Sequence, residues 1–249
     1  MSESICSIGS WSRRLGPSDF TGYGASAIRT DGSPSRGLRP LVAAYSRAVA
    51  TSALVEIIPE TPLPQSPTLW ISWHENNLIT LALHRRVTGR AAVAFVPPGA
   101  QGIAMSTWLS GVGATPVPLV GDARRGLGLR QMEAALASGK DVLIAVDGPT
   151  GPRHGIAPGA LWLARATDVE IRPAGCWASP ALRLPRWDRL MVPLPRARIA
   201  IALGAALTKQ KSAEAIPRLA ATLHRLNERA RDEVIARPNL TPEEAVPWR

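Results

Sequence analysis

The sequence predicts a single α/β domain in which helices cover both faces of a largely parallel central sheet of about six or seven strands. The first observation is an alternation: after residue 68, short apolar runs take turns with stretches of helical spacing, as they do in βαβ units. The second is composition, because 45% of the 249 residues are hydrophobic and only 19% are charged. That balance is typical of a folded domain and excludes a chain that is disordered throughout.

The N-terminal elements come before this alternation. Residues 1–37 are rich in Ser and Gly and show no periodicity, so they are expected to form a flexible tail. From Leu38 to Ile57 the apolar side chains recur near helical spacing, which predicts a helix. Four prolines between Pro59 and Pro67 then predict a stiff, non-helical connector.

The remaining elements follow from apolar runs and from apolar helical faces. Strands are expected at Leu69–Trp73, Ala91–Val96, Thr115–Val120, Val142–Val146, Val169–Gly175 and Arg198–Leu203. Helices are expected at Glu75–Val87, Gln101–Val112, Gly128–Ser138, Pro158–Thr167 and Ser212–Val234. We therefore divide the chain into the tail at 1–37, an α/β domain at 38–207, and a C-terminal amphipathic helix and tail at 208–249.

The carboxyl ends of the strands are where this fold class places its ligands, because the strand-to-helix loops converge there. Three of these loops carry polar side chains. His74 and Glu75 follow the first strand, Gly121, Asp122, Arg124 and Arg125 follow the third, and the segment Asp147–Arg153 follows the fourth. We expect these side chains to meet at one edge of the sheet, which makes that edge the candidate site.

His74 is the candidate general base, because histidine titrates near neutral pH and a strand end would hold it rigidly. The alternative is a helix-capping or buried histidine bound to a backbone carbonyl. Two Gly-Pro steps would fix Asp147, which could hold a polar ligand together with Arg153 or else shape a tight turn. Arg124 and Arg125 could bind a phosphate or form a solvated turn. No histidine pair has the spacing of metal ligands, so no metal is expected.

The formal net charge is +10, and all but three of the 29 basic side chains are arginine. This excess either reflects genome composition or serves anionic partners, such as phosphorylated substrates, anionic lipid or nucleic acid. Nucleic acid is disfavoured, because no recognition motif is present and there are only two Tyr and two Phe. Segment 183–198 interleaves arginines with apolar side chains, which suits an anionic membrane surface; alternatively, its apolar side chains pack on the sheet.

Cysteine content and apolar run length bear on the compartment. Cys6 and Cys176 do not make a disulfide framework, which fits a reducing environment. The first 40 residues contain no apolar core of a signal peptide, and no uncharged apolar run is long enough to span a bilayer. We expect a cytoplasmic protein that is either soluble or peripheral on the inner face of the membrane.

Several motifs occur in a fixed order along the chain. They are Trp73-His74 after a strand, Gly121-x-x-x-Arg125-Gly126, Val146-Asp147-Gly148-Pro149-Thr150-Gly151-Pro152, and Trp187-Asp188-Arg189 followed by Pro193-Leu194-Pro195. This ordered set resembles the bacterial branch, long catalogued as a domain of unknown function, of the lysophospholipid acyltransferase-like superfamily. The resemblance covers residues 38–207.

The resemblance implies a glycerolipid acyltransferase-like fold and an acyltransferase activity. It makes His74 the base that activates a hydroxyl of a lysophospholipid or related lipid for attack on an acyl thioester. The thioester donor would be acyl-CoA or acyl carrier protein, and no tightly bound cofactor is implied. The Asp147-Gly148 turn stands where the superfamily has an acceptor-binding motif, and Arg125 matches a phosphate-contacting arginine.

One departure concerns the superfamily motif His-x-x-x-x-Asp, whose aspartate orients the histidine; here that position is Ile79. Glu75, Asp122 and Asp147 remain open as substitutes. The predicted catalytic residues are His74, Asp147 and Glu75, and the predicted substrate-binding residues are Arg124, Arg125, Gly148 and Arg153. Two other functions stay open. One is a non-catalytic or degenerate family member that binds anionic lipid or nucleic acid; the other is a lipid acyl hydrolase, for which Ser72 and Thr150 lack a triad context.

Overall fold

The computed structural model describes residues 41, 44–45, 48–49, 51–97, 99–118, 125–148, 151–157, 159–207 and 215–237. The expected tail at 1–37 lies outside these residues, and so do the candidate residues Gly121, Asp122 and Arg124. Arg125 is described as the first residue of a helix, but its side chain is outside the description.

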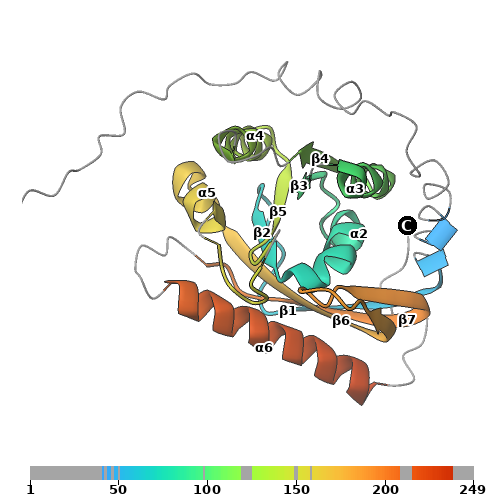
Figure 1. Cartoon of the computed structure of the whole chain (residues 1–249). Helices are drawn as coiled ribbons and strands as arrows, with labels where there is room; N and C mark the ends of the chain where they lie inside the picture. The colour runs from blue at the N-terminus through green and yellow to red at the C-terminus, as the bar shows by residue number, and fades with distance from the viewer. Residues whose placement is uncertain are drawn as a thin grey trace, which may run out of the picture.

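Seven strands form one sheet. They are β1 (Leu54–Pro59), β2 (Leu69–Ser72), β3 (Ala92–Val96), β4 (Ala114–Pro118), β5 (Asp141–Ala145), β6 (Ile171–Arg183) and β7 (Met191–Leu203). Their order across the sheet is β1-β7-β6-β2-β5-β3-β4, as Figure 1 shows. All neighbouring strands run parallel except β6 and β7, which form an antiparallel hairpin. The expectation of a largely parallel sheet is confirmed.

Helices cover both faces of this sheet (Figure 1). The elements are a short 3₁₀ turn η2 (His74–Asn76), α2 (Asn77–Thr88), α3 (Gly99–Gly111), α4 (Arg125–Ala137), α5 (Gly159–Thr167) and α6 (Ala215–Ala236). Buried side chains of α2 and α3 belong to one core cluster, whereas those of α4, α5 and the first half of α6 belong to another. The second half of α6 packs on β6 and β7. The single α/β sheet with two helical layers therefore agrees with the predicted fold class.

The expected helix at 38–57 is wrong at its C-terminal end. Its helical residues stop at Ser52, and Leu54–Pro59 form β1 instead. This strand pairs parallel with β7, so that Val55 lies opposite Ile199 and is fully buried. The run of Val and Ile side chains is typical of strands, because branching at Cβ restricts these side chains in a helix and packs well on a sheet.

The hairpin also differs from expectation, because β6 and β7 are each 13 residues long. The sequence predicted only the part of each strand that lies inside the sheet, at Val169–Gly175 and Arg198–Leu203. Beyond these runs, prolines and arginines interrupt the apolar pattern. Segment 183–198, which we considered as a separate membrane-facing stretch, turns out to form the turn and adjoining strands of this hairpin.

Asp141 fastens the amino edge of the sheet, on the side away from the candidate site. Its fully buried carboxylate accepts hydrogen bonds from the backbone N–H of Thr68 (2.9 Å), from Trp70 Nε1 (3.2 Å) and from Arg90 Nε (3.0 Å). His84 Nε2 lies 2.9 Å from the same carboxylate. These contacts tie the starts of β2 and β5 to α2. Among the helices described, none is long and apolar enough to cross a membrane.

Candidate active site

His74 lies at the carboxyl end of β2, where η2 begins. Its Nδ1 atom is 2.8 Å from Oδ2 of Asp188, a fully buried residue in the turn between β6 and β7. Because a carboxylate oxygen accepts a hydrogen bond, this geometry places the ring proton on Nδ1 and leaves the lone pair on Nε2. No partner of Nε2 is found among the described residues. The pair therefore has the arrangement of a general base oriented by an aspartate.

The turn that carries Asp188 is held in place by its neighbours. Oδ1 of Asp188 accepts the backbone N–H of Leu190 at 3.3 Å, and a guanidinium nitrogen of Arg186 lies 3.3 Å from Oδ2. The Trp187 ring packs against the His74 imidazole, with ring centroids 5.2 Å apart. The imidazole is thus fixed both by a hydrogen bond and by a ring contact from the same turn.

Asp147 holds the backbone of two loops rather than the ring of His74. Its Oδ1 accepts the backbone N–H of His74 at 2.7 Å, and its Oδ2 accepts that of His154 at 2.9 Å. The next residue, Gly148, lies directly beside the imidazole. A Cβ atom at this position would be 2.5 Å from Cδ2 of His74, so only glycine leaves the ring where it is. Asp147 and Gly148 therefore shape the space around the base.

Glu75 is a buried carboxylate, 4% exposed, that joins two arginines from different loops. Its Oε2 is 2.5 Å from Nη2 of Arg153 and 3.4 Å from Nη1 of Arg183. The two arginine side chains stay about one third exposed, at 34% and 30%. One carboxylate between two guanidiniums leaves a net positive charge beside His74. Donors that Glu75 does not use remain for an anionic ligand.

The other oxygen of Glu75 is bound from the C-terminal helix. Oε1 accepts a hydrogen bond from Nδ2 of Asn227 at 2.7 Å. The side-chain oxygen of Asn227 accepts the backbone N–H of Cys176, in β6, at 3.1 Å. Asn227 thereby connects α6 to both the sheet and the carboxylate that holds the arginines.

A cluster of rings lies on the same side of Glu75. His154 Nε2 is 3.5 Å from Oε1 of Glu75, and its ring packs on Trp73 (4.7 Å between centroids) and His224 (4.5 Å). Burial lowers the pKa of His154 below its ordinary value, and the nearby Glu75 carboxylate only partly offsets this effect. Burial therefore favours the neutral form of His154.

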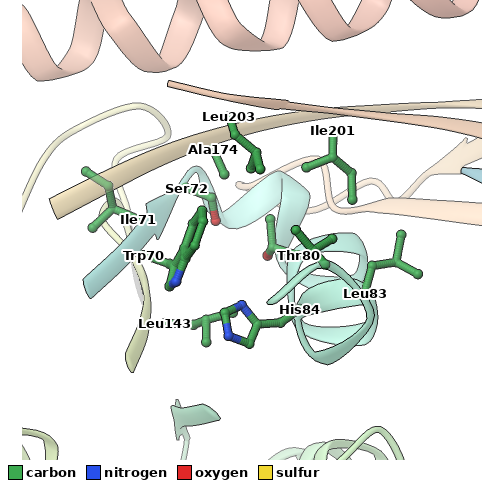
Figure 2. A pocket seen from close by; sticks show the side chains of 11 residues that line it. Trp70, Ile71, Ser72, Thr80, Leu83, His84, Leu143, Ala174, Ile201 and Leu203 are labelled. Carbon is green, nitrogen blue, oxygen red and sulfur yellow. The ribbon is translucent and has the colours of Figure 1, made fainter. Parts of the chain in front are cut away.

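A small, partly open cavity of about 30 Å³, lined mainly by apolar side chains, lies between α2 and the sheet (Figure 2). Ser72, two residues before His74 on β2, lines it, and Trp70 and His84 line it further toward the amino edge. The other lining residues are Ile71, Thr80, Leu83, Val87, Leu143, Ala174, Ile201 and Leu203.

Other site chemistries find little support in the described part of the chain. No three His, Cys, Asp or Glu side chains there converge in a way that could hold a metal ion. Burial raises the pKa of the Cys176 thiol, so this thiol stays protonated and is a poor nucleophile.

The structure brings five of the candidate residues together: His74, Glu75, Asp147, Gly148 and Arg153. The site also holds residues that were not among the candidates, including Asp188, Arg183 and Asn227. The sequence offered one indication of Asp188, since it is the only acidic residue between Ile171 and Leu203. The sequence offered no indication of Asn227, because its hydrogen bonds depend on how α6 lies against β6.

No family model matches the chain. Over 147 residues the chain is 24% identical to the uncharacterized protein RP090 of Rickettsia prowazekii (strain Madrid E). This alignment spans 58% of the chain and 66% of that protein, just under two thirds of its length. Among solved structures, the chain is similar to the 1-acyl-sn-glycerophosphate acyltransferase PlsC from Thermotoga maritima, with a TM-score of 0.46 and 13% identity. That likeness covers 85% of this chain and 86% of the other.

Proposed function

We propose that the protein is an acyltransferase of the lysophospholipid acyltransferase-like superfamily. It would move a fatty acyl group from a thioester donor, acyl-CoA or acyl carrier protein, to a hydroxyl of a lysophospholipid or related lipid. The observation that carries the proposal is the 2.8 Å contact between His74 Nδ1 and the buried Asp188, which leaves Nε2 as a base. The pair supplies the orienting aspartate that Ile79 cannot supply.

The reaction uses this pair in two proton transfers. Nε2 of His74 takes the proton of the acceptor hydroxyl as its oxygen attacks the thioester carbonyl carbon. The C–O bond forms, and the resulting tetrahedral oxyanion collapses with cleavage of the C–S bond. The leaving thiolate then receives the proton from the imidazolium. Asp188 stabilises that imidazolium through Nδ1 and keeps Nε2 directed at the substrate. The chemistry requires no tightly bound cofactor.

The anionic group of the acceptor is assigned to Arg153 and Arg183. Both guanidiniums are oriented by Glu75 and remain about one third exposed. Their two positive charges and the one negative charge of Glu75 leave a net charge of +1. Planar guanidiniums bind phosphate or carboxylate through paired hydrogen bonds. In this assignment Glu75 orients the arginines and does not touch the reacting atoms, whereas Asp147 positions the two loops that surround the base.

Transfer of a labelled acyl group from acyl-CoA to lysophosphatidic acid, by the purified full chain, tests the proposal. We expect transfer by the wild type and loss of roughly 10²–10⁴-fold in His74→Gln, the range that a general base contributes. Asp188→Asn keeps the shape of the side chain but no longer stabilises the imidazolium, so roughly a hundredfold loss in kcat is expected. Asp232→Asn, an exposed aspartate of α6, is the matched control and should retain wild-type activity.

Two results would contradict this assignment. Full transfer activity in His74→Gln would remove His74 as the base. Release of free fatty acid at the same rate with and without the lysolipid would identify a hydrolase instead of a transferase.

A further inference from the structure

The exposed side chains of the β6–β7 hairpin all lie in its distal part. β6 pairs with β2 only as far as Pro173 and then continues to Arg183 beside β7 alone. Figure 1 shows these two long strands running together along one side of the sheet. Within residues 171–203 the exposed residues are Ser179, Pro180, Leu182, Pro185, Arg189, Pro195 and Arg196. The distal part, residues 179–196, is therefore the solvent-facing end of the hairpin.

The charge of this distal part is uniformly basic on its surface. Its only acidic residue is Asp188, which is fully buried against His74. Arg189 and Arg196 are exposed, and neither guanidinium has a carboxylate partner among the described residues. Leu182 is 54% exposed, which is high for a large apolar side chain. Unpaired guanidiniums beside an exposed leucine suit phosphate headgroups and the apolar layer beneath them.

The chemistry of this end favours a lipid surface over nucleic acid. None of its seven exposed residues is aromatic, and its one aromatic side chain, Trp187, already packs on His74. Single-stranded nucleic acid is bound by stacking on exposed rings, which this described segment does not offer. An exposed leucine gains no binding energy from the phosphate backbone of a nucleic acid, whereas in a bilayer its apolar surface is removed from water.

We propose that residues 179–196 dock on the surface of an anionic lipid bilayer. Arg189 and Arg196 would contact lipid phosphates, and Leu182 would insert among the acyl chains. The same segment carries Asp188, and its Trp187 packs on the His74 ring, so docking would bring the base next to the bilayer. The proposal goes beyond acyl transfer and does not depend on it, because membrane binding is measurable without any donor.

Co-sedimentation of the full chain with lipid vesicles tests the docking. One vesicle preparation contains phosphatidylcholine alone, and the other also contains phosphatidylglycerol. We expect the wild type to bind the anionic vesicles and to bind less as salt is raised. Each arginine near an anionic surface contributes roughly fivefold to binding, so the double variant Arg189→Gln/Arg196→Gln should bind roughly thirtyfold more weakly. Leu182→Asp should weaken the binding that persists at high salt.

The matched control is Arg225→Gln/Arg229→Gln, which removes the same charge from α6. These arginines bind Glu60, which directly follows β1. The last residue of β1, Pro59, pairs with Leu203 at the end of β7 that is far from the hairpin turn, so the control arginines lie away from that turn. This control should bind anionic vesicles like the wild type. Unchanged melting temperatures and unchanged transfer to a short-chain, monomeric acceptor would show that Arg189→Gln/Arg196→Gln folds correctly.

Three outcomes would overturn the proposal. The first is a wild type that does not bind vesicles containing phosphatidylglycerol. The second is an equal loss of binding in the α6 control, which would indicate a general charge effect. The third is RNA binding that weakens in Arg189→Gln/Arg196→Gln while vesicle binding does not, which would make the hairpin a nucleic-acid surface.

Discussion

At the scale of single residues, the space around His74 depends on a missing side chain. Gly148 follows Asp147 at the end of β5, and its backbone approaches the imidazole closely enough that a Cβ atom would lie 2.5 Å from Cδ2. The ring is already fixed on its other sides by Asp188 and Trp187. A methyl group at residue 148 can therefore be accommodated only if the imidazole moves.

We predict that Gly148→Ala lowers kcat by roughly a hundredfold, because displacement of a catalytic group by about 1 Å has effects of this size. Steady-state kinetics of acyl transfer is the measurement. Gly111→Ala is the control, since a Cβ there meets no atom within 4 Å. If Gly148→Ala kept the wild-type kcat, the proposed position of the reactive imidazole would be wrong.

His154 gives a second prediction at this scale, concerning pH. Its pKa in the folded protein is below the ordinary 6.5, chiefly because of burial. At a pH between the lowered pKa of the folded protein and the ordinary pKa of 6.5 in the unfolded chain, His154 binds more protons in the unfolded chain. Acidification through this range therefore favours unfolding. The stability that neutral His154 contributes is fully present only above pH 6.5.

The melting temperature of the wild type should therefore fall more steeply than that of His154→Asn between about pH 7.5 and about pH 5.5. Asparagine suits the substitution because it tolerates the positive φ of 62° at this position. Thermal unfolding of both proteins across this range is the measurement. Parallel slopes would show that His154 does not contribute the pH dependence.

At the scale of elements, α6 does more than cover the sheet. Asn227 projects from it to bind both Glu75 and the backbone of β6. Gly175 of β6 permits this close approach, because a Cβ there would lie 2.4 Å from backbone atoms of Leu226 and Asn227. The helix thus reaches the carboxylate that orients Arg153 and Arg183.

We predict that Asn227→Ala raises KM for an anionic acceptor more than it lowers kcat. Loss of the 2.7 Å hydrogen bond frees Glu75 and its two arginines, while the His74–Asp188 pair is untouched. The buried groups left unpaired should also cost roughly 1–3 kcal/mol of stability. Kinetics with acceptors that bear or lack the phosphate would detect the difference. Glu228→Ala, its exposed neighbour, is the control, and an equal effect on both acceptors would refute the orienting role.

The elements also show what local sequence patterns can and cannot predict. The parallel strands β2, β3 and β5 were predicted close to their observed bounds, because buried strands read as continuous apolar runs. The distal part of the hairpin was not, because it lies outside the apolar core and its prolines and arginines break the pattern. His74 was predictable from its place at a strand end. Asp188 was noted only as part of the Trp187-Asp188-Arg189 motif, and its pairing with His74 was not predicted, because 114 residues separate the two.

At the scale of the whole molecule, two histidine–aspartate pairs lie at opposite edges of one sheet. His84 and Asp141 are at the amino edge, where Asp141 also binds Arg90 and Trp70. Burial alone would raise the pKa of Asp141, but the hydrogen bonds from His84 and Arg90 outweigh it and lower the pKa. His74 and Asp188 are at the carboxyl edge, beside two arginines that are about one third exposed. The first pair joins secondary-structure elements, whereas the second orients a histidine at the carboxyl end of β2.

Substitution of the two aspartates should separate these roles. Asp141→Asn is expected to destabilise the fold by about 3–5 kcal/mol, because it breaks a buried ionic cluster, and to leave kcat per folded molecule near the wild-type value. Asp188→Asn is expected to reduce kcat with the smaller loss of stability. Denaturant unfolding together with active-site-normalised kinetics measures both quantities. A folded Asp141→Asn protein without activity would contradict this division between the two edges.

The separation of His74 from Asp188 along the chain has a consequence for biosynthesis. When synthesis has reached only the end of β5, the histidine is already present, but the aspartate that would orient it has not yet been made. Because a domain folds as a unit, the pair can form only after the antiparallel hairpin has been made and has joined the sheet. A chain that lacks the folded hairpin would carry no oriented histidine, so the proposed activity would report that β6 and β7 are in place.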